Sequence, residues 1–188
     1  MGFHTYDVDR ADALEDDSRY RYVSVEELLG MIDPSSKMVV ADLGSGTGFY
    51  TDHVAPYVGK VYAVDVQEAM HDIYREKGAP KNVEFVTAEI ADLPFDDELL
   101  DVAFSTMTYH EFADDAALAE VHRVLRPDGK FVVADWSASG EGTDGPPVGE
   151  RYSLADAKEH LEAAGFDLPF ASERIETFVF VATKKKKN

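Results

Sequence analysis

Apolar and polar positions along the chain follow two alternating patterns. Short unbroken apolar runs are typical of strands buried on both faces of a sheet, and between them apolar residues recur every three or four positions, as on one face of a helix. The runs predict strands at Met38–Leu43, Lys60–Asp65, Val83–Thr87, Leu99–Ser105, Lys130–Trp136, Phe166–Phe170 and Ile175–Thr183. The intervening segments predict helices at Phe49–Val58, Gln67–Lys77, Asp114–Leu125 and, from a cap at Ser153, up to Ala164. Strands that alternate with helices predict an α/β fold, with a parallel sheet and helices on both faces.

An N-terminal arm precedes this pattern. Residues 1–23 are aromatic and charged without a clean period, although Arg10–Arg19 could form a short helix. Ser24–Glu27 is a capping box that opens a helix, and this helix ends at Asp33-Pro34. The arm could fold over a ligand as a lid, or it could pack as a cover on the sheet.

Three other segments carry neither pattern. Arg126–Gly129 predicts a tight turn, and residues 137–152 form a long loop rich in Gly, Pro and acid. Lys184–Lys187 predicts a disordered, solvated tail. We therefore expect one domain, with an arm and helix at 1–34, a cofactor-binding core at 35–183 and a Lys-rich tail at 184–188.

The composition narrows the class of protein. Asp and Glu number 37 against 18 Lys and Arg, giving a net charge of −19, which disfavours nucleic-acid partners because these are bound through cations. We interpret the acidity as adaptation to a salty cytoplasm; an acidic protein of an ordinary cell is the alternative. The absence of cysteine excludes disulfides and thiolate chemistry. No apolar run is long enough to cross a membrane and no secretory signal is visible, so we expect a cytoplasmic protein without integral membrane contact.

A glycine turn follows the first predicted strand, in the sequence Asp42-Leu-Gly-Ser-Gly-Thr-Gly48. Gly44 and Gly46 permit positive φ and the close approach of a ligand, toward which the following helix would direct free N–H groups. A dinucleotide site needs its third glycine at position 49, where this chain has Phe, so a nicotinamide oxidoreductase is disfavoured. Asp65 ends the second strand, where a carboxylate can accept hydrogen bonds from both ribose hydroxyls or can cap the next helix.

Five stretches in this order resemble class I S-adenosylmethionine-dependent methyltransferases of the methyltransferase-11 type, the group that includes the quinone-biosynthesis methyltransferases. They are Ala41–Gly48, Val61–Asp65, Ala88–Phe95, Leu100–Ser105 and Leu125–Val133. The resemblance implies a Rossmann-like, doubly wound sheet of seven strands in the order 3-2-1-4-5-7-6, with strand 7 antiparallel.

The resemblance also implies S-adenosylmethionine as cofactor. The residues that would bind it are Asp42, Gly44, Ser45, Gly46, Asp65, Val66, Glu89, Ile90 and Thr106. The glycine turn would pack under the methionine part, with Asp42 near the amino group and the backbone around Thr106 facing the same end. Asp65 would hold the ribose. The adenine would lie against Val66, Glu89 and Ile90. Glu89 stands where the family usually has Asp.

Methyl transfer requires mainly the alignment of the acceptor with an already activated methyl group, and a base only where the acceptor keeps its proton. The candidates at the end of the fourth strand are Tyr109, His110 and Glu111. His110 could take or orient an acceptor proton, or could cap the following helix. No second histidine stands at metal-ligand spacing, so no metal is expected.

The fifth strand ends in Asp135 and Trp136 on the same edge, and the Trp could be an acceptor wall or core. Arg151 could pair with an anionic acceptor or with a nearby acid. The end of strand four lacks the Asn/Asp-Pro-Pro-Tyr/Phe of nucleic-acid amino-methyltransferases, so we expect a small-molecule acceptor. The alternative function is a non-catalytic S-adenosylmethionine-binding sensor or partner subunit. The sequence names neither the acceptor atom nor the oligomeric state.

Overall fold

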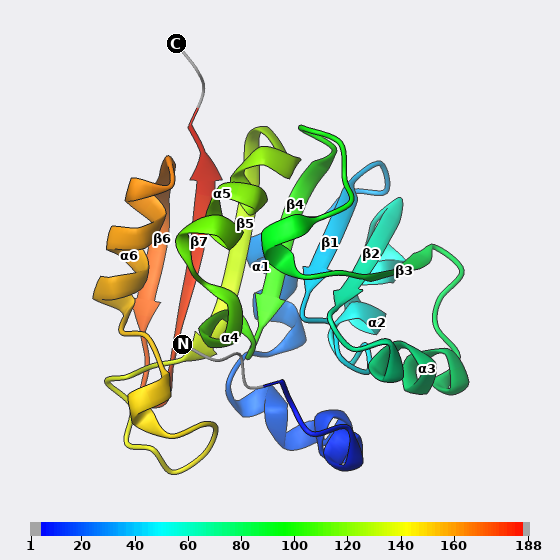
Figure 1. Cartoon of the computed structure of the whole chain (residues 1–188), viewed down its shortest axis with the longest axis horizontal. Helices are drawn as coiled ribbons and strands as arrows, with labels where there is room; N and C mark the ends of the chain where they lie inside the picture. The colour runs from blue at the N-terminus through cyan, green and yellow to red at the C-terminus, as the bar shows by residue number, and fades with distance from the viewer. Residues whose placement is uncertain (1–4, 186–188) are drawn as a thin grey trace.

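Seven strands form one sheet in the order β3-β2-β1-β4-β5-β7-β6 in the computed structural model, which describes residues 5–185 (Figure 1). The strands are β1 Val39–Leu43, β2 Lys60–Asp65, β3 Val83–Thr87, β4 Leu100–Thr106, β5 Leu125–Trp136, β6 Phe166–Glu173 and β7 Thr177–Lys184. β1 to β5 are parallel, whereas β7 runs antiparallel to both β5 and β6. The expected fold class, strand order and antiparallel seventh strand are confirmed.

Half of the α-helices in the described residues begin at a side-chain cap. The α-helices are α1 Val25–Ile32, α2 Thr51–Val54, α3 Glu68–Lys77, α4 Tyr109–Phe112, α5 Asp115–Val124 and α6 Leu154–Ala163. The 3₁₀ helices are η1 Val8–Glu15, η2 Asp17–Arg21, η3 Ala55–Tyr57, η4 Ile90–Asp92 and η5 Val148–Glu150. The hydroxyl of Ser24 accepts from the N–H of Glu27 at 3.2 Å, and Ser153 and Asp156 form a reciprocal capping box. The helix expected at 49–58 is shorter, because the chain tightens to 3₁₀ geometry at Pro56.

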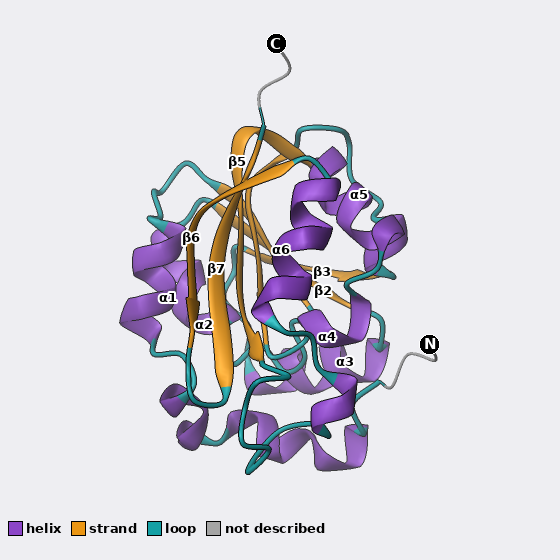
Figure 2. Cartoon of the chain, turned by 90° about the vertical axis from the view of Figure 1, so that its left-hand side faces the viewer, coloured by secondary structure: helices purple, strands orange, loops and turns teal. Residues whose placement is uncertain are grey.

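Two apolar cores lie on the two faces of the sheet. One packs α5 and α6 against the sheet and includes Val121 and Leu161, whereas the other packs α1 and α2 and includes Leu28 and Val54. Figure 2 shows these two pairs of helices on opposite sides of the strands. Within residues 5–185, no helix combines the length and apolarity needed to cross a membrane.

The arm and the long loop gather at one edge of the sheet. In Figure 1 the arm (blue) and the loop that follows β5 (yellow) lie at the lower edge, beside α4. The parallel strands end at this edge, so the residues that follow β1, β2 and β4 meet the arm there. In open α/β sheets this edge is where ligands bind.

Two local predictions are wrong. Residues 126–129 are not a turn between elements but a bulge within β5, exposed at 126–128 and buried at Gly129: Leu125 pairs with Leu100, and pairing resumes between Lys130 and Val102. Asp128, at φ +65°, bends the chain inside the bulge. The tail begins later than expected, because Lys184 is buried at the end of β7 and donates through Nζ to the Leu125 carbonyl at 2.7 Å. The rest of the predicted tail, from residue 186, lies outside the described residues.

Candidate active site

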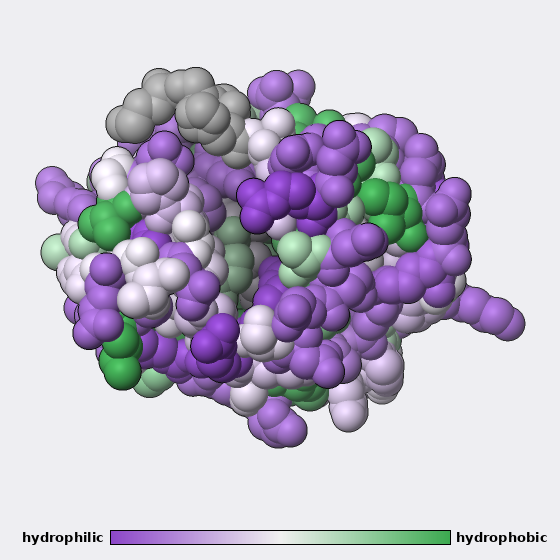
Figure 3. Space-filling view, turned by 90° about the horizontal axis from the view of Figure 1, so that it is seen from below, coloured by the Kyte–Doolittle hydropathy of each residue, from purple (hydrophilic) through white to green (hydrophobic). Residues whose placement is uncertain are grey.

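A cavity of about 800 Å³ opens at the edge where the parallel strands end. Figure 3, seen from below, shows the hollow in the middle of this face. Its walls come from the arm, the glycine turn, the ends of β2 and β4, η4, α4, Trp136 and the loop that follows it. The volume is within the range of small-molecule sites.

The glycine turn forms one wall of the cavity. Gly44 and Gly46 have φ of +80° and +52°, which side chains rarely adopt. A Cβ on Gly44 would lie 2.4 Å from Cγ2 of Thr108, so the turn has no room for a side chain at this position. The N–H groups of Gly44 and Ser45 both donate to the carbonyl of Val64 at 2.9 Å, which ties the turn to the end of β2.

Asp65 organises the same wall. Its Oδ2 accepts from the N–H of Gly46 at 2.8 Å, and its Oδ1 accepts from the N–H of Gln67 at 2.9 Å. The carboxylate therefore supports both the glycine turn and the segment that leads into α3. The N-cap residue of α3 is Gln67, so Asp65 does not itself cap the helix. Asp65 also lines the cavity, and each oxygen keeps a lone pair for a ligand. Its contact with a ribose stays a prediction.

Two buried polar atoms on this wall lack a hydrogen-bond partner among the described residues. Asp42 is 1% exposed, and its Oδ2 accepts from the hydroxyl of Thr51 at 2.6 Å. Its Oδ1 and the hydroxyl of Ser45 have no hydrogen-bond partner among the described residues. Burial raises the pKa of Asp42 to about 7. Unpartnered buried groups are rare in proteins, and here they face a cavity, so these residues fit the polar methionine end of S-adenosylmethionine.

The nine residues expected to bind the cofactor all line this one cavity. Val66 is 47% exposed at the end of β2, Ile90 is buried at the start of η4, and Glu89 precedes it. The carbonyl of Thr106 ends β4 and accepts from the hydroxyl of Thr108 at 3.2 Å. The arrangement places an apolar wall at the predicted adenine end and polar backbone at the predicted methionine end.

His110 stands across the cavity and is held by Asp135. The backbone N–H of His110 donates to Oδ2 of Asp135 at 2.6 Å, and Nδ1 of the ring lies 3.0 Å from both carboxylate oxygens. Asp135 is fully buried at the end of β5. Because a carboxylate only accepts hydrogen bonds, Nδ1 carries a proton and Nε2 keeps the lone pair in the neutral ring.

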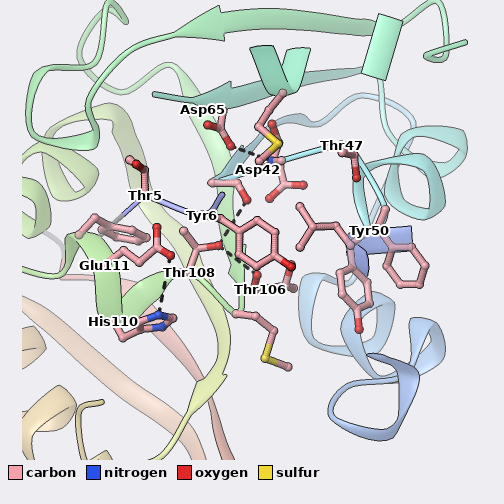
Figure 4. A pocket seen from close by; sticks show the side chains of 18 of the residues that line it. Thr5, Tyr6, Asp42, Thr47, Tyr50, Asp65, Thr106, Thr108, His110 and Glu111 are labelled. Atoms are coloured by element: carbon pink, nitrogen blue, oxygen red, sulfur yellow. Dashed lines mark hydrogen bonds and ion pairs between the residues drawn. The ribbon is translucent and has the colours of Figure 1, made fainter. Parts of the chain in front are cut away.

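Opposing effects set the pKa of His110. Burial disfavours the charged imidazole, but the carboxylates of Asp135 and Glu111 outweigh it, so the pKa is raised. Figure 4 shows Glu111 beside the ring, with its Oε1 3.8 Å from Nε2. Burial raises the pKa of Glu111 to about 7. This end of the cavity therefore holds two titratable groups whose pKa values are both raised.

The structure corrects the candidate role of Tyr109. Its side chain is fully buried and packs among the rings of Phe112, Phe178 and Phe180 rather than lining the cavity. Its neighbours His110 and Glu111 do line the cavity. The reason is the single helical turn of α4, which directs successive side chains to different sides.

The structure shows the surroundings of Trp136 and Arg151, for each of which the sequence left two alternatives. Trp136 is 9% exposed, packs on the ring of Tyr22 at 4.5 Å and also lines the cavity, so it is at once core and wall. Arg151 is buried, with Nη1 3.3 Å from Oε2 of Glu176, and its Nε donates to the Pro146 carbonyl at 2.8 Å. Arg151 thus pairs with a nearby acid and anchors the loop.

The arm lies over the cavity. Its residues on the cavity wall include Tyr6, Arg19 and Tyr22. Glu15 fixes the arm to the core, because it accepts from the hydroxyl of Thr47 and from Nζ of Lys77 at 3.1 Å. This position agrees with both the lid and the packing alternatives, and opening of the arm stays a prediction. Among residues 5–185, no group of three or more His, Asp or Glu side chains is placed to hold a metal ion.

Comparisons with known proteins identify the family of this chain. The family model of the methyltransferase domain, Methyltransf_11, matches residues 41–133. The crystal structure of a SAM-dependent methyltransferase from Aquifex aeolicus is 33% identical, with a TM-score of 0.87 over 95% of this chain and 99% of that one. The chain therefore belongs to the S-adenosylmethionine-dependent methyltransferases, which sets aside the nicotinamide alternative.

Curated relatives are similar over part of their length. A ubiquinone/menaquinone biosynthesis C-methyltransferase of Shewanella sp. (strain W3-18-1) is 35% identical over 108 residues, which are 53% of this chain and 43% of that protein. A malonyl-[acyl-carrier protein] O-methyltransferase of Serratia marcescens is 28% identical over 139 residues, 73% of this chain and 52% of that protein. The chain spans about half the length of these relatives or less.

Proposed function

We propose that this methyltransferase acts on a small-molecule acceptor that loses a proton, and that His110 receives or orients that proton. One observation carries the proposal: His110, which is held by Asp135 from behind, lines the same cavity as the nine residues expected to bind the cofactor. An acceptor between the two walls would have its nucleophile close to both.

S-adenosylmethionine, when bound, supplies a methyl group that is already activated on a sulfonium. The chain therefore has to position the acceptor and to keep water out. Asp65 and the glycine turn are suited to hold the nucleoside and the methionine end. The arm and Trp136 would cover the cavity, since both form its walls.

His110 is suited to proton transfer because it lines the cavity and its Nδ1 is held by Asp135, which leaves Nε2 as the basic atom of the ring. Asp135 holds Nδ1 and stabilises the imidazolium that forms when Nε2 takes the acceptor proton. The raised pKa of His110 sets the sign of the pH dependence. Turnover should rise with pH, because only the neutral ring can act as a base.

The names of the two curated relatives indicate different acceptors. A malonyl carboxylate is already ionised at neutral pH and needs no base. A hydroquinone or another acceptor that bears an acidic proton needs one. The buried His110–Asp135 pair favours the second kind, so we propose an acceptor with an ionisable O–H, N–H or activated ring C–H.

The test uses a metabolite extract with S-adenosylmethionine labelled in the methyl group, at high salt. Asp65→Ala should weaken the binding of S-adenosylhomocysteine, measured by calorimetry. His110→Ala should keep that binding and lower turnover of the acceptor. The same acceptor turned over equally by His110→Ala would contradict the role of His110, and no methylated product from the wild type in any extract would favour the non-catalytic sensor.

A further inference from the structure

Three arginines of the arm line the cavity, and they differ in what surrounds them. Arg10 and Arg21 are exposed, and Arg21 lies 3.9 Å from the carboxylate of Asp144. Arg19 is partly buried. No acid among the described residues lies within ion-pair distance of its guanidinium, which is unusual in a chain with twice as many acids as bases.

The guanidinium of Arg19 is held in place without a charged partner. Its central carbon lies 4.9 Å from the centre of the Phe49 ring and 5.3 Å from that of Tyr50. Its Nη1 donates to the carbonyl of Leu14 at 2.5 Å, and its own carbonyl accepts from the hydroxyl of Tyr50 at 3.1 Å. The side chain is thus oriented by two aromatic rings before any ligand arrives.

A guanidinium in this position has spare donors. Burial lowers the pKa of Arg19, which means that its charge is incompletely solvated. Of its five N–H donors, the described residues accept one hydrogen bond. A partly buried cation with free donors, aimed into a cavity, is a site for an anion, and the planar fork matches a carboxylate.

The nearby groups indicate which anion. Phe49 and Tyr50 immediately follow the glycine turn, and the electrostatic attraction of Asp42 reaches Arg19. The methionine end of S-adenosylmethionine carries one ammonium and one carboxylate. The unpartnered oxygen of Asp42 suits the ammonium, and the free donors of Arg19 suit the carboxylate.

We propose that Arg19 binds the carboxylate of S-adenosylmethionine and thereby ties the arm to the bound cofactor. This inference rests on the cofactor placement in the proposed function. It assigns the arm a role in cofactor binding: the chain closes over the methionine end with a cation that is placed but unpaired beforehand.

The experiment compares two nucleosides in calorimetry. S-adenosylhomocysteine has the amino-acid carboxylate, and 5′-methylthioadenosine has the same nucleoside and sulfur without it. Arg19→Ala should weaken the binding of S-adenosylhomocysteine by about 10- to 100-fold, which corresponds to the loss of a charge-assisted hydrogen bond. It should weaken the binding of 5′-methylthioadenosine by less than about twofold. Arg126→Ala, at the distant bulge of β5, is the control for losing one positive charge and should change neither affinity.

Each outcome decides the inference. Equal weakening of the two nucleosides by Arg19→Ala, or unchanged binding of S-adenosylhomocysteine, would overturn it. Arg19→Gln keeps a long polar side chain between the two aromatic rings, so it should fold even where Arg19→Ala does not, and it should show the same selective loss. Failure of the wild type to bind either nucleoside would instead contradict the cofactor placement.

Discussion

Replacing Asp135 by Asn tests the proton-transfer role of His110 with the smallest change of shape. Asn keeps an oxygen that can accept from the backbone N–H of His110, but it removes the negative charge 3.0 Å from Nδ1. Asp135 is fully buried and the His110 side chain is 10% exposed, so solvent screens this interaction little. The variant should fold with its cofactor site intact.

The expected loss of turnover follows from the contact between Asp135 and the His110 ring. A hydrogen bond to a charged group contributes about 1.5–3 kcal/mol. If that stabilisation is larger for the imidazolium formed in the transition state than for the neutral ring, Asp135→Asn lowers turnover by about 10- to 150-fold. The binding of S-adenosylhomocysteine should stay within about twofold, because Asp135 does not line the cavity.

The pH dependence gives a second and independent measurement. Burial lowers the pKa of His110 and Asp135 raises it, so removal of the charge should lower the pKa. The rise of turnover with pH should then begin at lower pH in the variant, although the maximum is smaller. NMR titration of the ring, assigned among the six histidines by its loss in His110→Gln, measures the same pKa without an acceptor.

Two results would refute this reasoning. Unchanged turnover of the true acceptor by Asp135→Asn would show that the pair is structural. Lower turnover with an unchanged His110 pKa would show that the carboxylate acts through some other group.

Three further predictions concern the walls of the cavity. Gly44→Ala should destabilise the fold by about 1–3 kcal/mol in thermal melts, whereas Gly30→Ala, with open space and helical backbone, should be neutral or stabilising. Asp42→Asn should gain thermal stability relative to the wild type as pH rises from about 4 to above 7, because the pKa of the folded carboxyl, about 7, exceeds its ordinary value. Arg151→Ala should lower the free energy of unfolding in denaturant, since it removes the ion pair with Glu176 and the hydrogen bond to the Pro146 carbonyl that anchor the loop.

The fold was predictable from local pattern because the central strands carry short runs of mostly apolar residues. Strands of the parallel core begin and end within a residue or two of their predicted bounds, apart from β5. The helix α4 was not predicted because its four residues make only about one turn, too short for an apolar pattern to repeat. The bulge at 126–129 was missed because its Pro-Asp-Gly residues are equally typical of a turn, and only pairing with β4 distinguishes the two.

The residues of the site likewise fall into those that local sequence predicts and those that only the fold brings together. The residues predicted to bind the cofactor belong to short motifs in which neighbours along the chain remain neighbours in space, as with Gly44 and Asp42. The His110–Asp135 pair joins residues 25 positions apart, through the adjacency of β4 and β5. Both strands were predicted to end at one edge, so this signal was available, but the pairing of the two side chains was not. Arg19 has no motif, and only the packing of the arm places it at the cavity.

This difference between local motifs and contacts made by the fold explains why the family match identifies the methyl donor better than the methyl acceptor. The family model covers residues 41–133, which include the glycine turn, Asp65 and His110. The partner of His110, the Trp136 wall and the arm all lie outside that range. Relatives that share the matched region can therefore share the cofactor and still differ in acceptor. Acceptor specificity in this chain should accordingly change on substitution at Tyr22 or Trp136, with the affinity for S-adenosylhomocysteine retained.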